Sequence, residues 1–261
     1  MDHRPKTFTS TKPRRVALTL LTCVYAVLWI GGVIQGWRGA FAGLSWVAAV
    51  FLMLAGLIVL VGTCSRGERL SLGAVALLGF IAEAVGVHFD VPFGAYSYTD
   101  ALGPRLLGVP LAMAFAWMTL AAYVKQTVAH LGFPWPMETL VGALWLTALD
   151  LLIDPLAANQ LGFWRWEVSG AYYGVPLINF AGWLLISLLS FIILGKKFER
   201  SLPAQLTGIS MILFFTLLAV GFSSYFVAFV GCSLLLAHGL TLRRKQQPRR
   251  EAFTPSPLTR H

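Results

Sequence analysis

The sequence predicts an all-α fold: a polytopic integral membrane helical bundle with eight spans, or seven as the alternative. Of its 261 residues, 57% are hydrophobic and only 12% are charged, and the mean hydropathy is +0.72. A water-soluble globule of this size would need more polar surface than this composition supplies. The apolar residues form long unbroken runs, which favour spanning helices over the short alternating segments of a transmembrane barrel.

Six apolar runs and one longer run give the spans. The first six predicted spans cover about residues 16–36, 44–62, 72–88, 109–128, 137–155 and 176–194. Residues 204–242 would form a single helix about 58 Å long at about 1.5 Å per residue, almost twice the thickness of the hydrocarbon layer. We therefore expect two short spans there, with a turn near residues 221–224.

The basic residues predict the orientation of the bundle. With eight spans, 17 of the 20 Lys and Arg residues lie on one side, and Arg38, Arg105 and Arg165 lie on the other. This bias predicts a multi-pass protein of the cell (plasma) membrane with both termini in the cytoplasm, surrounded by membrane lipids. It also explains the net charge of +9 without nucleic acid as a partner. The predicted domain covers residues 16–242, between disordered basic tails at 1–15 and 243–261.

Two segments of the chain resemble each other. The sequence GVPLAMAFAW (108–117) has the form of GVPLINFAGW (174–183), and an acid-bearing apolar segment precedes each copy. This pattern predicts an internal repeat, in which spans three and four and spans five and six form similar helix-loop-helix units that face one another. In each GVPL segment we expect Gly in a turn and Pro at the first helical position.

Four acidic residues near the ends of apolar segments are the candidate catalytic residues. Asp150 and Asp154 are four residues apart and share a helix face, and Pro155 is expected to push Asp154 out of regular helix. Glu83 and Asp90 are seven apart and likewise share a face. If these helices are neighbours, desolvation and mutual repulsion favour the neutral form of at least one acid, which then holds a proton for donation.

Structural alternatives stay open for these acids. Asp154 could cap a helix end and face water, as could Asp90, while Glu83 could pair with Arg105 or Arg165. Glu83 and Asp150 are the stronger candidates, because they lie deeper in apolar sequence, where charge is most costly.

Aromatic and polar residues beside the acids are candidates for substrate binding. Their rings could line the entry of an apolar ligand and stabilise a transient cation, or they could form the aromatic belt at the headgroups. His88 could relay a proton or make an ordinary hydrogen bond, and Asn179 could bind a buried carboxylate or water. The candidates are His88, Tyr96, Tyr98, Trp117, Trp164, Trp166, Tyr172, Tyr173, Asn179 and Trp183.

The sequence predicts neither a metal nor a cofactor. It has no HxxH cluster for a di-iron centre, no glycine-rich phosphate loop and no dinucleotide fingerprint. The aspartates of DLLID (150–154) have the spacing of the motifs with which intramembrane prenyltransferases bind magnesium. Those enzymes need a second such motif, and this sequence has none.

The segments FGAYSYTDALGP with GVPL (93–111) and DP, WRW and YYGVPLINFAGW (154–183) resemble the CruF-type carotenoid biosynthesis family, the membrane carotenoid 1',2'-hydratases. The resemblance covers roughly residues 75–195. It implies an enzyme that adds water to the terminal double bond of an acyclic carotenoid end, as in lycopene or gamma-carotene, without a redox cofactor. It assigns no catalytic residue.

The carboxylate pattern agrees with this chemistry. Hydrating an isolated alkene needs a strong acid, groups that tolerate a tertiary cation, and a positioned water. Our hypothesis makes Asp150 or Glu83 the proton donor and its partner carboxylate the cation stabiliser or water base, with a carotenoid substrate that enters from the bilayer. A membrane lycopene cyclase-like enzyme and a non-catalytic proton-coupled transporter or carrier are the alternatives.

Overall fold

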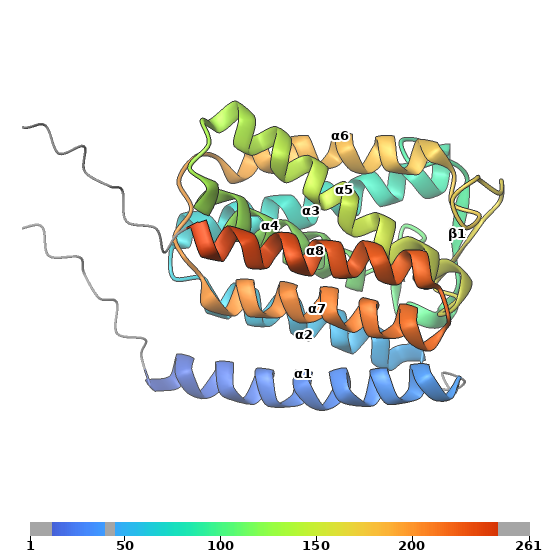
Figure 1. Cartoon of the computed structure of the whole chain (residues 1–261), viewed down its shortest axis with the longest axis horizontal. Helices are drawn as coiled ribbons and strands as arrows, with labels where there is room; N and C mark the ends of the chain where they lie inside the picture. The colour runs from blue at the N-terminus through green and yellow to red at the C-terminus, as the bar shows by residue number, and fades with distance from the viewer. Residues whose placement is uncertain (1–11, 40–44, 245–261) are drawn as a thin grey trace, which may run out of the picture.

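The chain forms a bundle of eight α-helices within residues 12–39 and 45–244, which are the residues that the computed structural model describes (Figure 1). By length and composition, six of these helices can cross a membrane: α1, α3, α5, α6, α7 and α8. The predicted all-α membrane bundle is confirmed. The helices are α1 (Lys12–Arg38), α2 (Ser45–Gly62), α3 (Arg66–Phe89), α4 (Ala112–Val128), α5 (Trp135–Asn159), α6 (Leu177–Leu194), α7 (Leu202–Gly221) and α8 (Tyr225–Arg244).

The last long apolar run forms two helices, as predicted. α7 ends at Gly221 and α8 begins at Tyr225, with Ser223 in the left-handed region at φ 55°. The start of α1 and the end of α8 therefore lie at the same end of the bundle (Figure 1).

α1 begins at Lys12, earlier than predicted, within the segment expected to be a tail. The Arg14 side chain donates hydrogen bonds to the carbonyl oxygens of Val61 (2.7 Å) and Gly62 (2.8 Å), and so joins the start of α1 to the end of α2. Positive groups are favourable at this end of a helix, where carbonyl oxygens lack partners. α8 likewise continues to Arg244, into the segment expected to be the second tail. The rest of the predicted tails, residues 1–11 and 245–261, lies outside the described residues.

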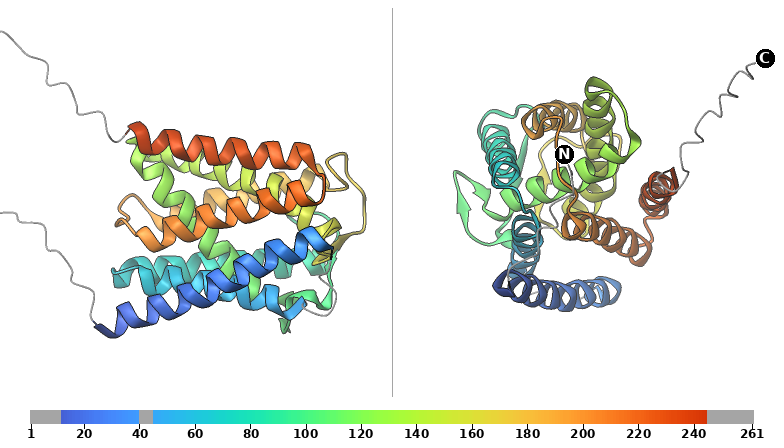
Figure 2. Two further views of the ribbon diagram at one scale, coloured as in Figure 1. Left: turned by 60° about the horizontal axis from the view of Figure 1, so that its bottom comes forward. Right: turned by 90° about the vertical axis from the view of Figure 1, so that its left-hand side faces the viewer.

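α4 lies in the centre of the bundle and α1 lies at its edge (Figure 2). Helices α2, α3, α5, α6, α7 and α8 all contact α4, whereas α1 packs on α2 and α7. α4 has 17 residues and is buried from Trp117 to Val128. It can be short because it contacts protein rather than lipid along most of its length.

The two predicted helix-loop-helix units do face one another. One consists of α3, the first loop (residues 90–111) and α4, the other of α5, the second loop (residues 160–176) and α6. The two units meet where α3 packs against α6. The loops are joined by an antiparallel pair of short strands, β1 (Tyr96–Tyr98) and β4 (Trp164–Trp166). Trp117 and Trp183, the last residues of the two similar segments, stack with ring centroids 4.2 Å apart.

The GVPL segments turn as predicted, but their prolines lie outside the helices. Gly108 and Gly174 have φ values of 76° and 83°, which favour glycine. The prediction of Pro at the first helical position is wrong. Pro110 belongs to β3 (Val109–Pro110), which pairs with β2 (Arg105–Leu106), and Pro176 is the extended residue before α6, with ψ 141°.

The prediction that Pro155 displaces Asp154 from regular helix is also wrong, because α5 continues through Pro155 to Asn159. A proline inside a helix has no N–H for the carbonyl four residues earlier, here that of Leu151. The Tyr172 hydroxyl donates to this carbonyl oxygen at 2.9 Å. The second loop thus supplies the hydrogen bond that Pro155 removes, and Asp150 and Asp154 stay on one helix face.

Candidate active site

Glu83 on α3 is buried among hydrogen-bond donors, with 5% of its surface exposed. Oε2 accepts hydrogen bonds from the hydroxyls of Tyr96 and Tyr98, the latter at 2.8 Å. Oε1 accepts one from Trp117 Nε1 at 3.0 Å. Three donors from the first loop and α4 therefore hold one carboxyl in place.

Two glycines of α3 make room for these donors. Gly79 and Gly86 lie one turn before and after Glu83, on the same helix face. A Cβ atom would lie 2.3 Å from Cγ of Trp117 at Gly79, and 2.9 Å from the Tyr96 hydroxyl at Gly86. The small residues on this face of α3 thus allow both rings to approach Glu83.

Asp150 and Asp154 on α5 are both 1% exposed and share one amide partner. Asn179 Nδ2 donates to Oδ2 of Asp150 at 2.6 Å and to Oδ2 of Asp154 at 2.7 Å. Asp154 Oδ1 also accepts hydrogen bonds from Nε1 of Trp164 (2.8 Å) and of Trp166 (3.3 Å). Asp154 thus accepts three hydrogen bonds and Asp150 accepts one.

The three carboxyls line one cavity at the loop end of the bundle. Its volume of about 20 Å³ matches a single water molecule. Within the described part of the chain, no Lys, Arg or His pairs with any of the three acids. The lining residues are Glu83, Phe93, Tyr96, Tyr98, Met113, Asp150, Asp154, Trp164, Trp166, Asn179 and Trp183.

The two tyrosines of β1 are hydrogen-bond donors at this site. Burial raises the pKa of Tyr96 and of Tyr98 well above the ordinary value, and the Glu83 carboxyl raises each pKa further. Both hydroxyls therefore keep their protons at physiological pH and donate to Glu83.

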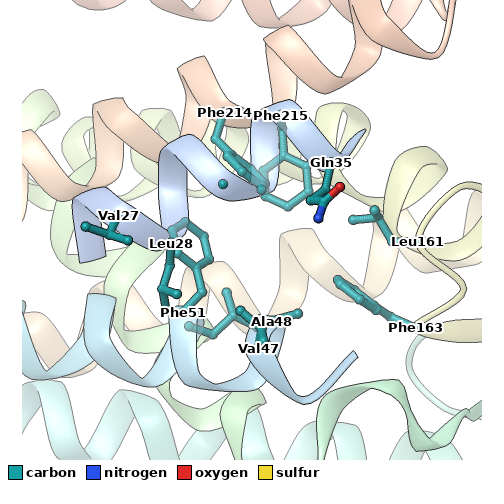
Figure 3. Close-up of a pocket in the computed structure, with 13 residues that line it drawn as sticks. Val27, Leu28, Gln35, Val47, Ala48, Phe51, Leu161, Phe163, Phe214 and Phe215 are labelled. Carbon is teal, nitrogen blue, oxygen red and sulfur yellow. The ribbon is translucent and has the colours of Figure 1, made fainter. Parts of the chain in front are cut away.

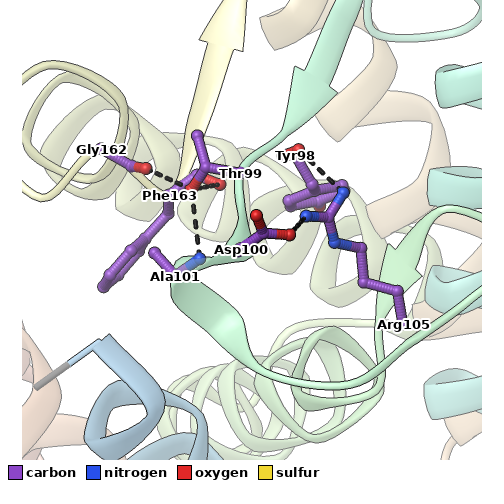
Figure 4. Close-up of polar contacts among 7 residues, drawn as sticks. All are labelled: Tyr98, Thr99, Asp100, Ala101, Arg105, Gly162 and Phe163. Carbon is purple, nitrogen blue, oxygen red and sulfur yellow. Dashed lines mark hydrogen bonds and ion pairs between the residues drawn. The ribbon is translucent and has the colours of Figure 1, made fainter. Parts of the chain in front are cut away.

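Hydrogen bonds fix the first loop to the second beside the cavity (Figure 4). The Thr99 hydroxyl donates a hydrogen bond to the carbonyl oxygen of Gly162 at 2.5 Å. The Thr99 backbone N–H donates one to the carbonyl oxygen of Phe163 at 3.0 Å. Arg105 pairs with Asp100 and donates to the Tyr98 carbonyl oxygen at 3.0 Å.

The structure does not support the pairing of Glu83 with an arginine. Arg105 is engaged by Asp100, and Arg165 is exposed on β4. The alternative in which Asp154 faces water is likewise wrong, since its side chain is buried beneath two tryptophans.

Five of the predicted site residues do not line the cavity: Trp117, which reaches the site through its hydrogen bond to Glu83, and Asp90, His88, Tyr172 and Tyr173. Asp90 is exposed and follows the last residue of α3 in the left-handed conformation (φ 61°), so its seven-residue spacing from Glu83 does not bring them together. His88 is also exposed, and its Nδ1 lies 2.8 Å from the Ala84 carbonyl oxygen. Tyr172 binds the α5 backbone, and the carbonyl oxygen of Tyr173 accepts a hydrogen bond from Asn159 at 2.7 Å.

Two residues that line the cavity, Phe93 and Met113, were not among the predicted candidates. Met113 lies one helical turn before Trp117 on the same face of α4, and it takes the place in the first GVPL segment that Asn179 takes in the second. Aligning the two segments would have pointed to Met113. Phe93 contacts the rings of Tyr96 and Trp117, but an apolar residue in a loop gives no comparable signal.

The carboxyls of the site do not form a metal-binding cluster in the described part of the chain. Among the described residues, no three His, Cys, Asp or Glu side chains are grouped so that they could hold a metal ion. The arrangement can do acid–base chemistry, because it combines three carboxyls and an amide with space for a water. Five N–H or O–H donors from Trp and Tyr bind the carboxyls of Glu83 and Asp154.

Comparisons with known proteins agree with the sequence resemblance. A family model described as "carotenoid biosynthesis protein" matches residues 41–244, which include every residue of the cavity. The bisanhydrobacterioruberin hydratase of Haloarcula japonica is 34% identical over 154 residues, which cover 57% of this chain and 51% of that relative. The chain thus matches about half the length of this curated relative. No solved structure matches the chain. Since the family model covers most of its length, the chain belongs to the carotenoid biosynthesis protein family.

Proposed function

We propose that this protein is a carotenoid hydratase, which adds water to the terminal double bond of an acyclic carotenoid end group such as that of lycopene or gamma-carotene. One observation carries the proposal: three carboxyls are buried around a cavity for one water, with no cation paired to them in the described part of the chain. The name of the Haloarcula relative supports the same reaction class.

Asp150 is the proposed proton donor. Glu83 and Asp154 each accept three hydrogen bonds, which stabilise a carboxylate, whereas Asp150 accepts one, from Asn179. When one of several buried carboxyls carries a proton, the favoured one is the carboxyl with the fewest hydrogen-bond donors, because its charge is the least stabilised. Asp150 is that carboxyl.

The proposed reaction consists of protonation of the alkene and capture of the cation by water, after which a proton transfer regenerates the acid. The π bond of the alkene breaks as its electron pair forms a C–H bond between the less substituted carbon and the Asp150 proton. This leaves the Asp150 carboxylate and a tertiary cation on the neighbouring carbon. The water oxygen bonds to this cation and gives a proton to Asp154, one helical turn away on the same face. Transfer of that proton to Asp150 restores the enzyme, so the net reaction consumes one alkene and one water and needs no cofactor.

The surroundings suit a transient cation. The carboxylates of Glu83 and Asp154 oppose its charge, and the stacked indoles of Trp117 and Trp183 lie beside the cavity. A carotenoid end is larger than about 20 Å³, so side chains must move when it enters. Met113 lines the cavity and has a flexible, unbranched side chain that suits such movement.

We further propose that the protein lies in the cell membrane with both termini in the cytoplasm, so that the cavity lies near the outer surface. Arg66, Arg69, Lys196 and Lys197 lie at the end of the bundle opposite the cavity, where α1 begins and α8 ends. This placement agrees with the excess of basic residues on cytoplasmic sides.

Expression in a lycopene-producing host, followed by pigment extraction, tests the function. The proposal predicts a more polar pigment whose mass is greater by one water and whose polyene absorption is unchanged. A product of unchanged mass with a new ring would instead show a cyclase-like enzyme. Unconverted pigment, together with proton-dependent uptake of a solute, would show a transporter; either result would overturn the proposal.

A further inference from the structure

A second, larger pocket lies between α1, α2 and α7 (Figure 3). Its volume is about 350 Å³, within the range of ligand pockets, which is roughly 300–1,000 Å³. Of the described residues that line it, Gln35 alone has a polar side chain. Four phenylalanines form much of the wall: Phe51, Phe163, Phe214 and Phe215.

The pocket extends along α1. Residues of one face of α1, from Val27 to Gln35, line it, which corresponds to about 12 Å at about 1.5 Å per residue. Gly31 lies within this face, and a Cβ atom there would meet nothing within 4 Å. The absence of a side chain at Gly31 therefore leaves part of the pocket open.

One end of the pocket borders lipid and the other borders the carboxyl cavity. Val27 lines the pocket and is 68% exposed, on a helix face that a membrane would surround with acyl chains. Leu161 and Phe163 line the opposite end (Figure 3), and the next residue, Trp164, lines the carboxyl cavity and binds Asp154. A short segment of the second loop thus separates the two spaces.

We propose that this pocket binds part of the polyene chain of the substrate, an inference that rests on the proposed hydratase function. The occupant is a long, flat, conjugated hydrocarbon: the lining offers aromatic faces and little polar surface, and the pocket leads from the lipid to the wall of the site. A lipid acyl chain shares the apolar chemistry but has no reaction at the carboxyl cavity.

Filling the gap at Gly31 tests this inference. We expect Gly31→Leu to lower kcat/KM for a C40 acyclic carotenoid at least tenfold, mainly through KM, and Gly31→Ala to have an intermediate effect. A short acyclic isoprenoid with the same end group should react equally well with the variant and the unchanged protein, because it does not reach the pocket. Gly73→Leu is the matched control, since Gly73 is exposed on α3 and also has nothing within 4 Å.

The outcomes separate this inference from the proposed function. Equal losses with the long and short substrates, or no loss with either, would overturn the polyene site while leaving the hydratase intact. If the unchanged protein hydrates no substrate, the amount of polyene that co-purifies with each protein tests the site. Polyene that co-purifies with the unchanged protein but not with Gly31→Leu would support it. Loss of co-purified lipid with unchanged polyene retention would assign the pocket to an acyl chain.

Discussion

Individual hydrogen bonds distinguish the three buried acids. Glu83 is held by phenol and indole donors, and Trp117 Nε1 is the donor that comes from α4. A hydrogen bond to a charged group contributes about 1.5–3 kcal/mol. We expect Trp117→Phe to lower kcat/KM by about tenfold or more, measured by product formation with purified protein.

Trp183→Phe is the matched control for that change. Trp183 stacks on Trp117 and loses a similar volume in the variant, but it makes no hydrogen bond to Glu83. Its loss of activity should therefore be smaller. Equal losses in the two variants would mean that ring packing, and not the indole N–H, governs the effect.

The residues of the site that could be predicted are mainly the acidic ones that lie within apolar segments of the sequence. Glu83, Asp150, Asp154 and Asn179 are buried together, as hydropathy led us to expect. Asp90 was included because its spacing assumed that the helix continues, whereas α3 ends at Phe89. A helix end is set by local backbone conformation, which spacing alone does not reveal.

Close packing of α3 and α4 depends on glycine at position 79. A Cβ atom there would lie 2.3 Å from the Trp117 ring, so the ring or the helix must shift. Overpacking of this kind costs about 1–3 kcal/mol. We expect Gly79→Ala to lower both thermal stability in detergent and activity, while Gly73→Ala on the open side of α3 leaves both nearly unchanged. Unchanged activity in Gly79→Ala would show that the position of Trp117 is unimportant.

At the opposite end of the bundle, an ion pair joins α4 to α5. Lys125 is buried and its Nζ lies 2.5 Å from Glu138 Oε1 and 2.6 Å from the Gly195 carbonyl oxygen. Breaking a buried pair costs about 3–5 kcal/mol, because one charge is left without a partner. We expect Lys125→Met to lower the midpoint of thermal unfolding.

The double variant Lys125→Met/Glu138→Gln is the control for that prediction. It removes both charges and should recover most of the lost stability, and neither variant should change kcat, since the site lies at the other end of α4. A double variant as unstable as the single one would contradict a role for the unpaired charge.

The helices were predictable as elements, but their connections were less so. Long apolar runs locate all eight helices to within several residues, and the turn of α7 into α8 follows from length alone. The pairing of β1 with β4 was not predicted, since strands of three residues give little periodicity. The role of Tyr172 was missed for a similar reason: it depends on α5 continuing through Pro155, against the local preference of proline.

The molecule as a whole presents its cavity at one end and most of its basic connectors at the other. In a variant without the three native cysteines, we expect Val168→Cys in the second loop to react with a membrane-impermeant maleimide on intact cells. Lys197→Cys, in the connector between α6 and α7, should react only after the cells are permeabilised. Both positions are exposed in the structure, so the reverse pattern would place the cavity at the cytoplasmic side.

The acid chemistry of the buried carboxyls is tested most directly by hydration in ¹⁸O-labelled water, with purified Asp150→Asn compared against Asp90→Asn. The unchanged protein and Asp90→Asn should form a product that carries one labelled hydroxyl at equal rates, because Asp90 is exposed and outside the cavity. Asp150→Asn should be slower by about 10²–10⁴-fold, the usual contribution of a general acid. Labelled product formed at the unchanged rate by Asp150→Asn would contradict the assignment of Asp150 as the proton donor.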